Sequence, residues 1–170
     1  MKKHNGMRPQ DIVVLLKIAA KKDTPWMLKD LAAELKISPS EVSEAVNRSL
    51  LAGLIAADKR TLMKGALLEF LQYGLRYVFP QQPGAIVRGM ATAHSAPPLN
   101  GVIQSTEPYV WAWAKGNLRG QSVTPLHPSV PHACAHDSVL YEILSLADAL
   151  RIGKAREQQL AMKELEQRIA

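Results

Sequence analysis

The chain has 170 residues, of which 47% are hydrophobic and 21% are charged, and its formal net charge is +6 at pH 7. This length suits one domain, or a small domain with an extension, and the apolar fraction excludes a wholly disordered chain. The single cysteine, Cys134, excludes an internal disulfide and a zinc site built on paired cysteines. The most apolar N-terminal run, residues 12–20, is too short to cross a bilayer, so we expect a cytoplasmic protein without a membrane partner.

The positive charge is concentrated at the N-terminal end. The net charge is +5 over residues 1–64, +2 over residues 65–136 and −1 over residues 137–170. A basic segment indicates a polyanionic partner such as a nucleic acid, although an ordinary basic surface has the same composition.

Prolines divide the chain into three parts. Eight of the eleven lie between Pro80 and Pro131, and each removes a backbone donor that a helix needs. The sequence therefore predicts a mainly α fold with a small β component, in which a Pro-rich irregular or β middle separates N-terminal from C-terminal helices. We expect two units, residues 1–64 and 65–170, of which the second would supply the contacts to a partner or a second copy.

The N-terminal part begins with the spacing of two helices. Pro9 can stand in the first turn of one helix, whose apolar face begins at Ile12. After a short strand candidate at Trp26, residues 28–35 have the pattern of a second, shorter amphipathic helix.

A third helix has several agreeing signals at its start. Ser38 can cap it, Pro39 fits its first position, and Glu41 has the spacing of a capping box. Gly53 can supply the left-handed residue that ends many helices.

The third helix is polar on the side opposite its apolar face. Two short helices joined by a tight turn, the second polar outside, are typical of a helix-turn-helix, whose second helix fits the major groove of B-DNA. Asn47 can bond adenine through two atoms, and Arg48 can bond guanine or a phosphate. A helical hairpin with a merely solvated polar side is the alternative. The candidate DNA-binding residues of this helix are Ser40, Ser43, Glu44, Asn47 and Arg48.

A candidate wing follows this helix. Two short apolar segments within residues 54–63 enclose a polar turn at 58–61. Lys59, Arg60 and Lys64 would contact phosphates beside the groove.

With these elements in order, residues 9–64 resemble the winged helix-turn-helix fold, and they are similar to bacterial transcriptional regulators of the MarR type and their relatives. The resemblance implies that the helix after Ser38 reads the groove and that the protein is a homodimer. Met27 stands where such regulators often have Ser or Thr, and its side chain cannot cap a helix. No family resemblance covers residues 65–170. The stretches that carry the resemblance are Trp26-Met27-Leu28-Lys29-Asp30-Leu31-Ala32 and Ile37-Ser38-Pro39-Ser40-Glu41-Val42-Ser43.

Helical patterns also flank the Pro-rich middle. Residues 63–79 are apolar nearly all round, which predicts the central core helix. Asp137 or Ser138 can open a further helix, which Gly153 breaks. A last helix, about residues 154–169, would pack across a dimer axis or on its own subunit.

Aromatic residues alternate in the middle segment. Tyr109, Trp111 and Trp113 have a period of two, which predicts a strand with three aromatic side chains on one face. With the basic, glycine-containing segment 115–120 they could form a platform that stacks exposed bases. A pocket for an apolar effector is a second interpretation, and packing in the core or in a dimer interface is the commonest fate of such residues.

A cluster of histidines and the cysteine ends the Pro-rich part. His and Cys suit zinc, but their spacing here matches no zinc motif, so we expect no metal and no cofactor. Catalytic pairs converge in space rather than in sequence, and the chain has no nucleophile elbow, phosphate-binding loop or dinucleotide fingerprint, so we do not expect an enzyme. The cluster consists of His127, His132, Cys134 and His136.

These patterns predict a prokaryotic, sequence-specific protein that binds double-stranded DNA and regulates transcription, most simply a repressor that acts as a homodimer on an inverted repeat. A protein partner or ligand that relieves binding would act through residues 80–136. The alternative is an interaction protein, antitoxin-like or part of a defence system, that binds a protein partner and autoregulates its operon. A metal-dependent or cysteine enzyme is a second alternative.

Overall fold

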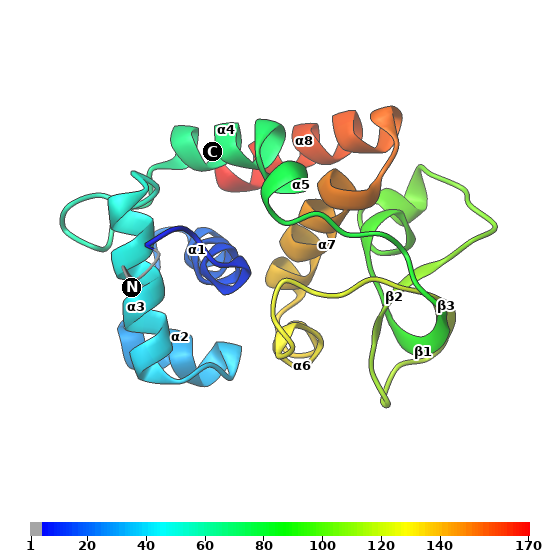
Figure 1. The fold of residues 1–170 in the computed structure, drawn as a ribbon, viewed down its shortest axis with the longest axis horizontal. Helices are drawn as coiled ribbons and strands as arrows, with labels where there is room; N and C mark the ends of the chain where they lie inside the picture. The colour runs from blue at the N-terminus through cyan, green and yellow to red at the C-terminus, as the bar shows by residue number, and fades with distance from the viewer. Residues whose placement is uncertain (1–4) are drawn as a thin grey trace.

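Three helices build the N-terminal part of the fold. In the computed structural model, which describes residues 5–170, every residue from Asp11 to Ala19 of the first helix is buried. This burial arises because the first helix packs on the second and third helices and also on the long helix of the C-terminal part (Figure 1). The elements are α1 (Pro9–Lys21), α2 (Leu28–Leu35), α3 (Pro39–Leu51) and, in the C-terminal part, α7 (Ser138–Ile152).

The ends of these helices follow the sequence signals closely. The Ser38 hydroxyl accepts a hydrogen bond from the Glu41 amide at 3.2 Å, but the reciprocal bond to the Glu41 carboxylate is not made within residues 5–170. Gly53 adopts a φ of 80° just after α3, as its position predicts. At the start of α2, the Asp30 carboxylate accepts from the Met27 amide at 2.9 Å, which is the half of a capping box that does not need a polar side chain at position 27.

A short hairpin follows α3. Ile55 and Leu62 form an antiparallel bridge, and the Ala56 amide donates to the Thr61 carbonyl at 2.8 Å. The paired segments are shorter than full strands. The predicted strand at Trp26 is wrong, because residues 25–27 have no regular structure and the Trp26 side chain is buried.

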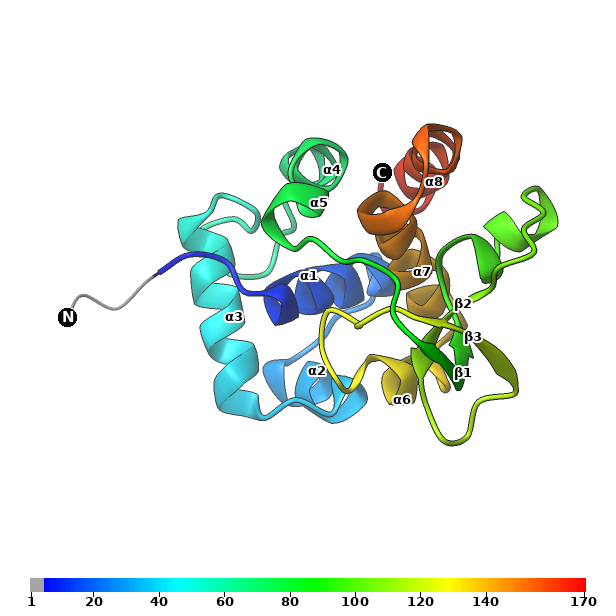
Figure 2. The ribbon, with the colours of Figure 1, turned by 45° about the vertical axis from the view of Figure 1, so that its right-hand side comes forward.

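The prediction of one central core helix over residues 63–79 is also wrong. The segment breaks at Gly74 into α4 (Lys64–Tyr73) and α5 (Leu75–Val78). α4 lies on the outside of the molecule beside the C-terminal helix (Figure 2). Tyr73 at its end is 67% exposed, and Tyr77 of α5 is 68% exposed. A periodicity pattern treats tyrosine as apolar and therefore predicts that it is buried. The tyrosine hydroxyl can nevertheless be exposed to water.

The central helix is instead α7. All of its residues from Ile143 to Leu150 are buried, because α1, α5, α8 (Ala155–Ile169) and the small sheet surround it. It begins as predicted, since the Asp137 carboxylate caps it by accepting from the Leu140 amide at 3.0 Å. The buried side of α8 rests on the same subunit, where Met162, Leu165 and Ile169 join the core.

The Pro-rich middle folds into a small sheet. Its strands are all mutually paired: β1 is antiparallel to both β2 and β3, and β2 is parallel to β3. Gly89 permits this tight closure, since a Cβ there would lie 1.9 Å from the Trp111 carbonyl oxygen. The prediction of a mainly α fold with a small β component is confirmed. The elements of this part are β1 (Ile86–Ala91), η1 (Ala93–Ser95), η2 (Leu99–Gly101), β2 (Tyr109–Ala112), β3 (Leu118–Ser122) and α6 (Val130–Cys134).

One hydrophobic core runs through both predicted units, because α1 packs on α7 and α8. A polar contact joins them as well: the Lys17 ammonium, on α1, lies 2.5 Å from the Asp137 carboxylate and 2.9 Å from that of Glu34 on α2. No helix within residues 5–170 combines the length and the apolar character that crossing a membrane requires.

Candidate nucleic-acid interface

The outward side of α3 is polar and open to solvent. Ser40, Glu44 and Asn47 are exposed and Ser43 is half-buried, whereas the opposite side of the helix is packed against α1 and α2. α3 lies at one end of the molecule, far from the small sheet (Figure 1). The structure therefore leaves four of the five predicted side chains of this helix accessible.

The turn of the hairpin beside α3 is held by Asp58. One oxygen of its carboxylate accepts from the amides of Arg60 and Thr61, both at 2.8 Å, and the other accepts from the Thr61 hydroxyl at 2.6 Å. These hydrogen bonds, chiefly those from Thr61, lower the pKa of Asp58 to about 2. A carboxylate that fixes its own turn explains how a four-residue loop stays ordered without full strands.

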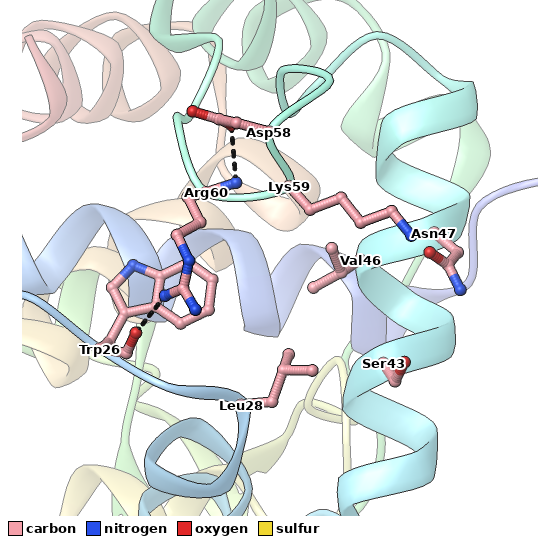
Figure 3. A pocket seen from close by; sticks show the side chains of 8 residues that line it. All are labelled: Trp26, Leu28, Ser43, Val46, Asn47, Asp58, Lys59 and Arg60. Carbon is pink, nitrogen blue, oxygen red and sulfur yellow. Dashed lines mark hydrogen bonds between the residues drawn. The ribbon is translucent and has the colours of Figure 1, made fainter.

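The two basic residues of the turn point in different directions (Figure 3). The Arg60 guanidinium donates to the Trp26 carbonyl oxygen, and its central carbon lies 5.1 Å from the centre of the Trp26 ring. Lys59 is exposed and extends from the turn towards Asn47 on α3. Lys59 is thus free to meet an anion, while Arg60 fastens the turn to the segment before α2.

A cavity of about 240 Å³ lies between α3, the turn and the start of α2 (Figure 3). Ser43, Asn47, Lys59 and Arg60 line it together, so the structure brings four of the predicted residues to one place. Ser40 and Glu44 lie on α3 outside this cavity, and Lys64 is exposed at the first residue of α4.

The position of Arg48 does not match its predicted role as a contact to guanine or a phosphate. Its Nε and one terminal nitrogen both donate to the carboxylate of Asp11 at 2.8 Å, and the side chains are 10% and 0% exposed. The hydrogen bonds that Arg48 donates to the Asp11 carboxylate are the main reason that the pKa of Arg48 is raised. Arg48 therefore turns inward and joins α3 to α1, so it is not among the residues available to a base. The physical reason is that the same Asp11 carboxylate, which also accepts from the Arg8 amide at 2.9 Å, would be buried without a counter-charge.

The aromatic residues of the middle segment are largely used in packing. The indole of Trp111 is buried, donates to Asp148 at 2.6 Å and packs against Tyr141 at 5.9 Å between ring centres. Tyr109 packs against His94 at 4.5 Å. Trp113 lies just beyond the end of β2 and is half-buried.

The His/Cys cluster is not gathered around a point. The ring of His127 bonds the Ser129 hydroxyl at 2.7 Å, and the rings of His132 and His136 lie 6.0 Å apart, edge to face. In the described part of the chain, no group of three or more His, Cys, Asp or Glu side chains could hold a metal ion. Burial raises the pKa of the Cys134 thiol, which keeps it protonated at neutral pH.

Comparisons with models of protein families, with curated proteins and with solved structures found no match for this chain. Sequence reasoning missed Trp26 and Asp58, which shape the cavity, and Asp11, which holds Arg48. Only Asp58 had a local signal, since an Asp at the start of a polar turn is a common turn cap; the other two contacts join segments far apart in the sequence.

Proposed function

We propose that this protein is a sequence-specific, double-stranded DNA-binding regulator of transcription, in which residues 9–64 act as a winged helix-turn-helix. The observation that carries the proposal is the open polar side of α3, with a basic turn directly beside it. An α-helix with its side chains is about 10–12 Å across, which fits a major groove about 12 Å wide, and the 13 residues of α3 extend for about 20 Å.

Each side chain has a role that fits its position. Asn47 would bond adenine, and Glu44 would accept from the amino group of cytosine. The Ser40 and Ser43 hydroxyls, near the start of α3, would contact bases or the backbone. Lys59 and Lys64 would bind phosphates that flank the groove, and they would contribute affinity without sequence preference.

The regulator is proposed to act as a homodimer on an inverted repeat. Two copies of α3 would then occupy successive major grooves about 34 Å apart. Occlusion of a promoter by the bound dimer, which makes the protein a repressor, is the simplest mechanism.

The test is selection of binding sites from random duplex DNA at a stated salt concentration, followed by titration of the selected site and a scrambled duplex. We expect enrichment of a palindromic motif. Asn47→Ala should then weaken binding to the selected site by about 1–3 kcal/mol and affect the scrambled duplex far less.

Asn100→Ala is the matched control, because Asn100 is an exposed asparagine outside the proposed interface. It should leave both affinities unchanged. Absence of any enriched motif contradicts the proposal, and so does an Asn47→Ala variant that loses equal affinity for both duplexes.

A further inference from the structure

Two arginines stand opposite each other on the small sheet. Arg88 of β1 and Arg119 of β3 are direct partners in the antiparallel register, and both are exposed. Directly opposite side chains lie on the same face with Cβ atoms about 5 Å apart, where like charges destabilise a sheet. The pair therefore does not contribute to the stability of the sheet.

No carboxylate neutralises the two arginines. Glu107 is the one acidic residue in the sequence between positions 80 and 136. Within residues 5–170, neither Arg88 nor Arg119 forms an ion pair with it or with any other carboxylate. The corner of the sheet around them therefore has an uncompensated positive charge.

An aromatic residue and a lysine lie at the same corner. The Trp113 amide donates to the Arg88 carbonyl at 3.1 Å, which continues the β1–β2 register and places both side chains on one face. The turn that follows lies against β1, since a Cβ on Gly116 would be 2.1 Å from the Gly89 carbonyl oxygen. Lys115, next to Gly116, is exposed there.

A broad open cavity of about 600 Å³ adjoins this corner. Trp113, Met90 and Tyr141 give it apolar and aromatic walls. Met90 is two residues from Arg88 on the same strand, so both lie on one face of the sheet. The cavity also borders the Asp137 carboxylate, whose charge is already balanced by Lys17 at 2.5 Å.

We propose that this corner of the sheet binds single-stranded nucleic acid, with a phosphate on Arg88 and Arg119 and a base against Trp113 in the cavity. Guanidinium groups match the geometry of phosphate oxygens through paired hydrogen bonds. A base can stack on Trp113 only when it is free of its own duplex, which is why the single strand is favoured over double-stranded DNA.

This site is distinct from the interface on α3. The two lie at opposite ends of the molecule (Figures 1 and 2), so a duplex bound along α3 would leave the sheet open. The proposal goes beyond the proposed regulatory function and does not depend on it.

The test is fluorescence anisotropy with the full chain and a labelled oligothymidylate of about a dozen nucleotides, within the site sizes of single-strand binding folds. We expect the double variant Arg88→Ala/Arg119→Ala to bind about tenfold or more weakly at low salt. The slope of log affinity against log salt should become shallower by about 0.7, because the two arginines share one phosphate and each lost phosphate contact to a single strand accounts for about 0.7.

Two further variants test the stacked base. Trp113→Ala should weaken binding about fivefold to a hundredfold, the range for one lost stacking contact, whereas Trp113→Phe should retain most of the affinity. Arg156→Ala is the matched control, since Arg156 is an exposed arginine of α8 without an ion pair in the described residues, and it should bind like the parent protein.

Four outcomes would overturn the proposal. These are no binding of the oligothymidylate by the parent protein, unchanged affinity in the double variant, equal competition by a random duplex, and loss of binding in Lys59→Ala. The last outcome would place the single-stranded DNA at the turn beside α3 instead. Failure here leaves the selection of duplex sites unaffected, so the two proposals fail separately.

Discussion

The N-terminal part and the small sheet use their arginines in opposite ways. In the first, Arg48 is bound by the buried Asp11 and Arg60 by the Trp26 carbonyl, so two of the three arginines of residues 1–64 support the fold. In the sheet, Arg88 and Arg119 face each other and are exposed without an ion pair in the described residues.

This contrast shows that net charge does not tell which arginines support the fold. Residues 1–64 have a charge of +5 and residues 65–136 only +2, yet the two facing arginines that form no ion pair in the described residues lie in the second segment. An arginine supports the fold when the tertiary structure brings a buried acceptor, such as the Asp11 carboxylate, within hydrogen-bond distance of it.

The largest expected effect concerns the buried pair. Arg48→Ala should lower the free energy of unfolding by about 3–5 kcal/mol, because it leaves the Asp11 carboxylate buried without a counter-charge. Urea denaturation measures the loss. The double variant Asp11→Ala/Arg48→Ala should lose less than the sum of the two single variants.

Arg156→Ala serves as the control and should change stability by less than about 0.5 kcal/mol. If Arg48→Ala is as stable as this control, the inward position of Arg48 is not what holds α3 to α1, and its assignment as a DNA contact returns.

A smaller effect is expected from the free lysine of the turn. Lys59→Ala should weaken binding to the selected site and to a scrambled duplex by the same factor, and it should lower the salt slope by about 0.9, one phosphate contact. Anisotropy titrations over a salt series measure both. Lys163→Ala, an exposed lysine on α8, is the control, and a loss confined to the selected site would mean that Lys59 reads bases.

In the sheet, replacing an arginine should stabilise the protein instead of destabilising it. Arg119→Glu places a carboxylate opposite Arg88, so it should raise the free energy of unfolding by about 0.2–1 kcal/mol while it removes binding of the oligothymidylate. Chemical denaturation and anisotropy on the same preparation test this. A less stable variant would show that the two side chains do not repel each other in the folded sheet.

The smallest effect is local and depends on pH. The folded pKa of Asp58 is lowered from 3.8 to about 2, so the turn keeps its hydrogen bonds at neutral pH and loses them as the pH falls through about 2. The amide signals of Arg60 and Thr61 in NMR spectra should titrate with that midpoint. In Thr61→Ala the midpoint should rise towards 3.8, and a parent midpoint near 3.8 contradicts the turn geometry.

Much of the fold could be predicted because its signals are local. The start of α3 at Ser38, its end at Gly53 and the start of α7 at Asp137 each depend on hydrogen bonds within one turn. The exposure of Tyr73 could not be predicted in this way, because it depends on where α4 lies relative to the rest of the fold.

The candidate site divides along the same line. The sequence by itself determined that α3 is an amphipathic helix with a polar side and that a short polar turn follows it, since both result from periodicity and turn chemistry. Only the tertiary structure decided that Arg48 turns inward to Asp11, 37 residues away, and that Arg88 meets Arg119 across the sheet. The physical reason is that a charged side chain contacts whichever segment the folded chain brings near it. Its neighbours in the sequence therefore do not determine its partner.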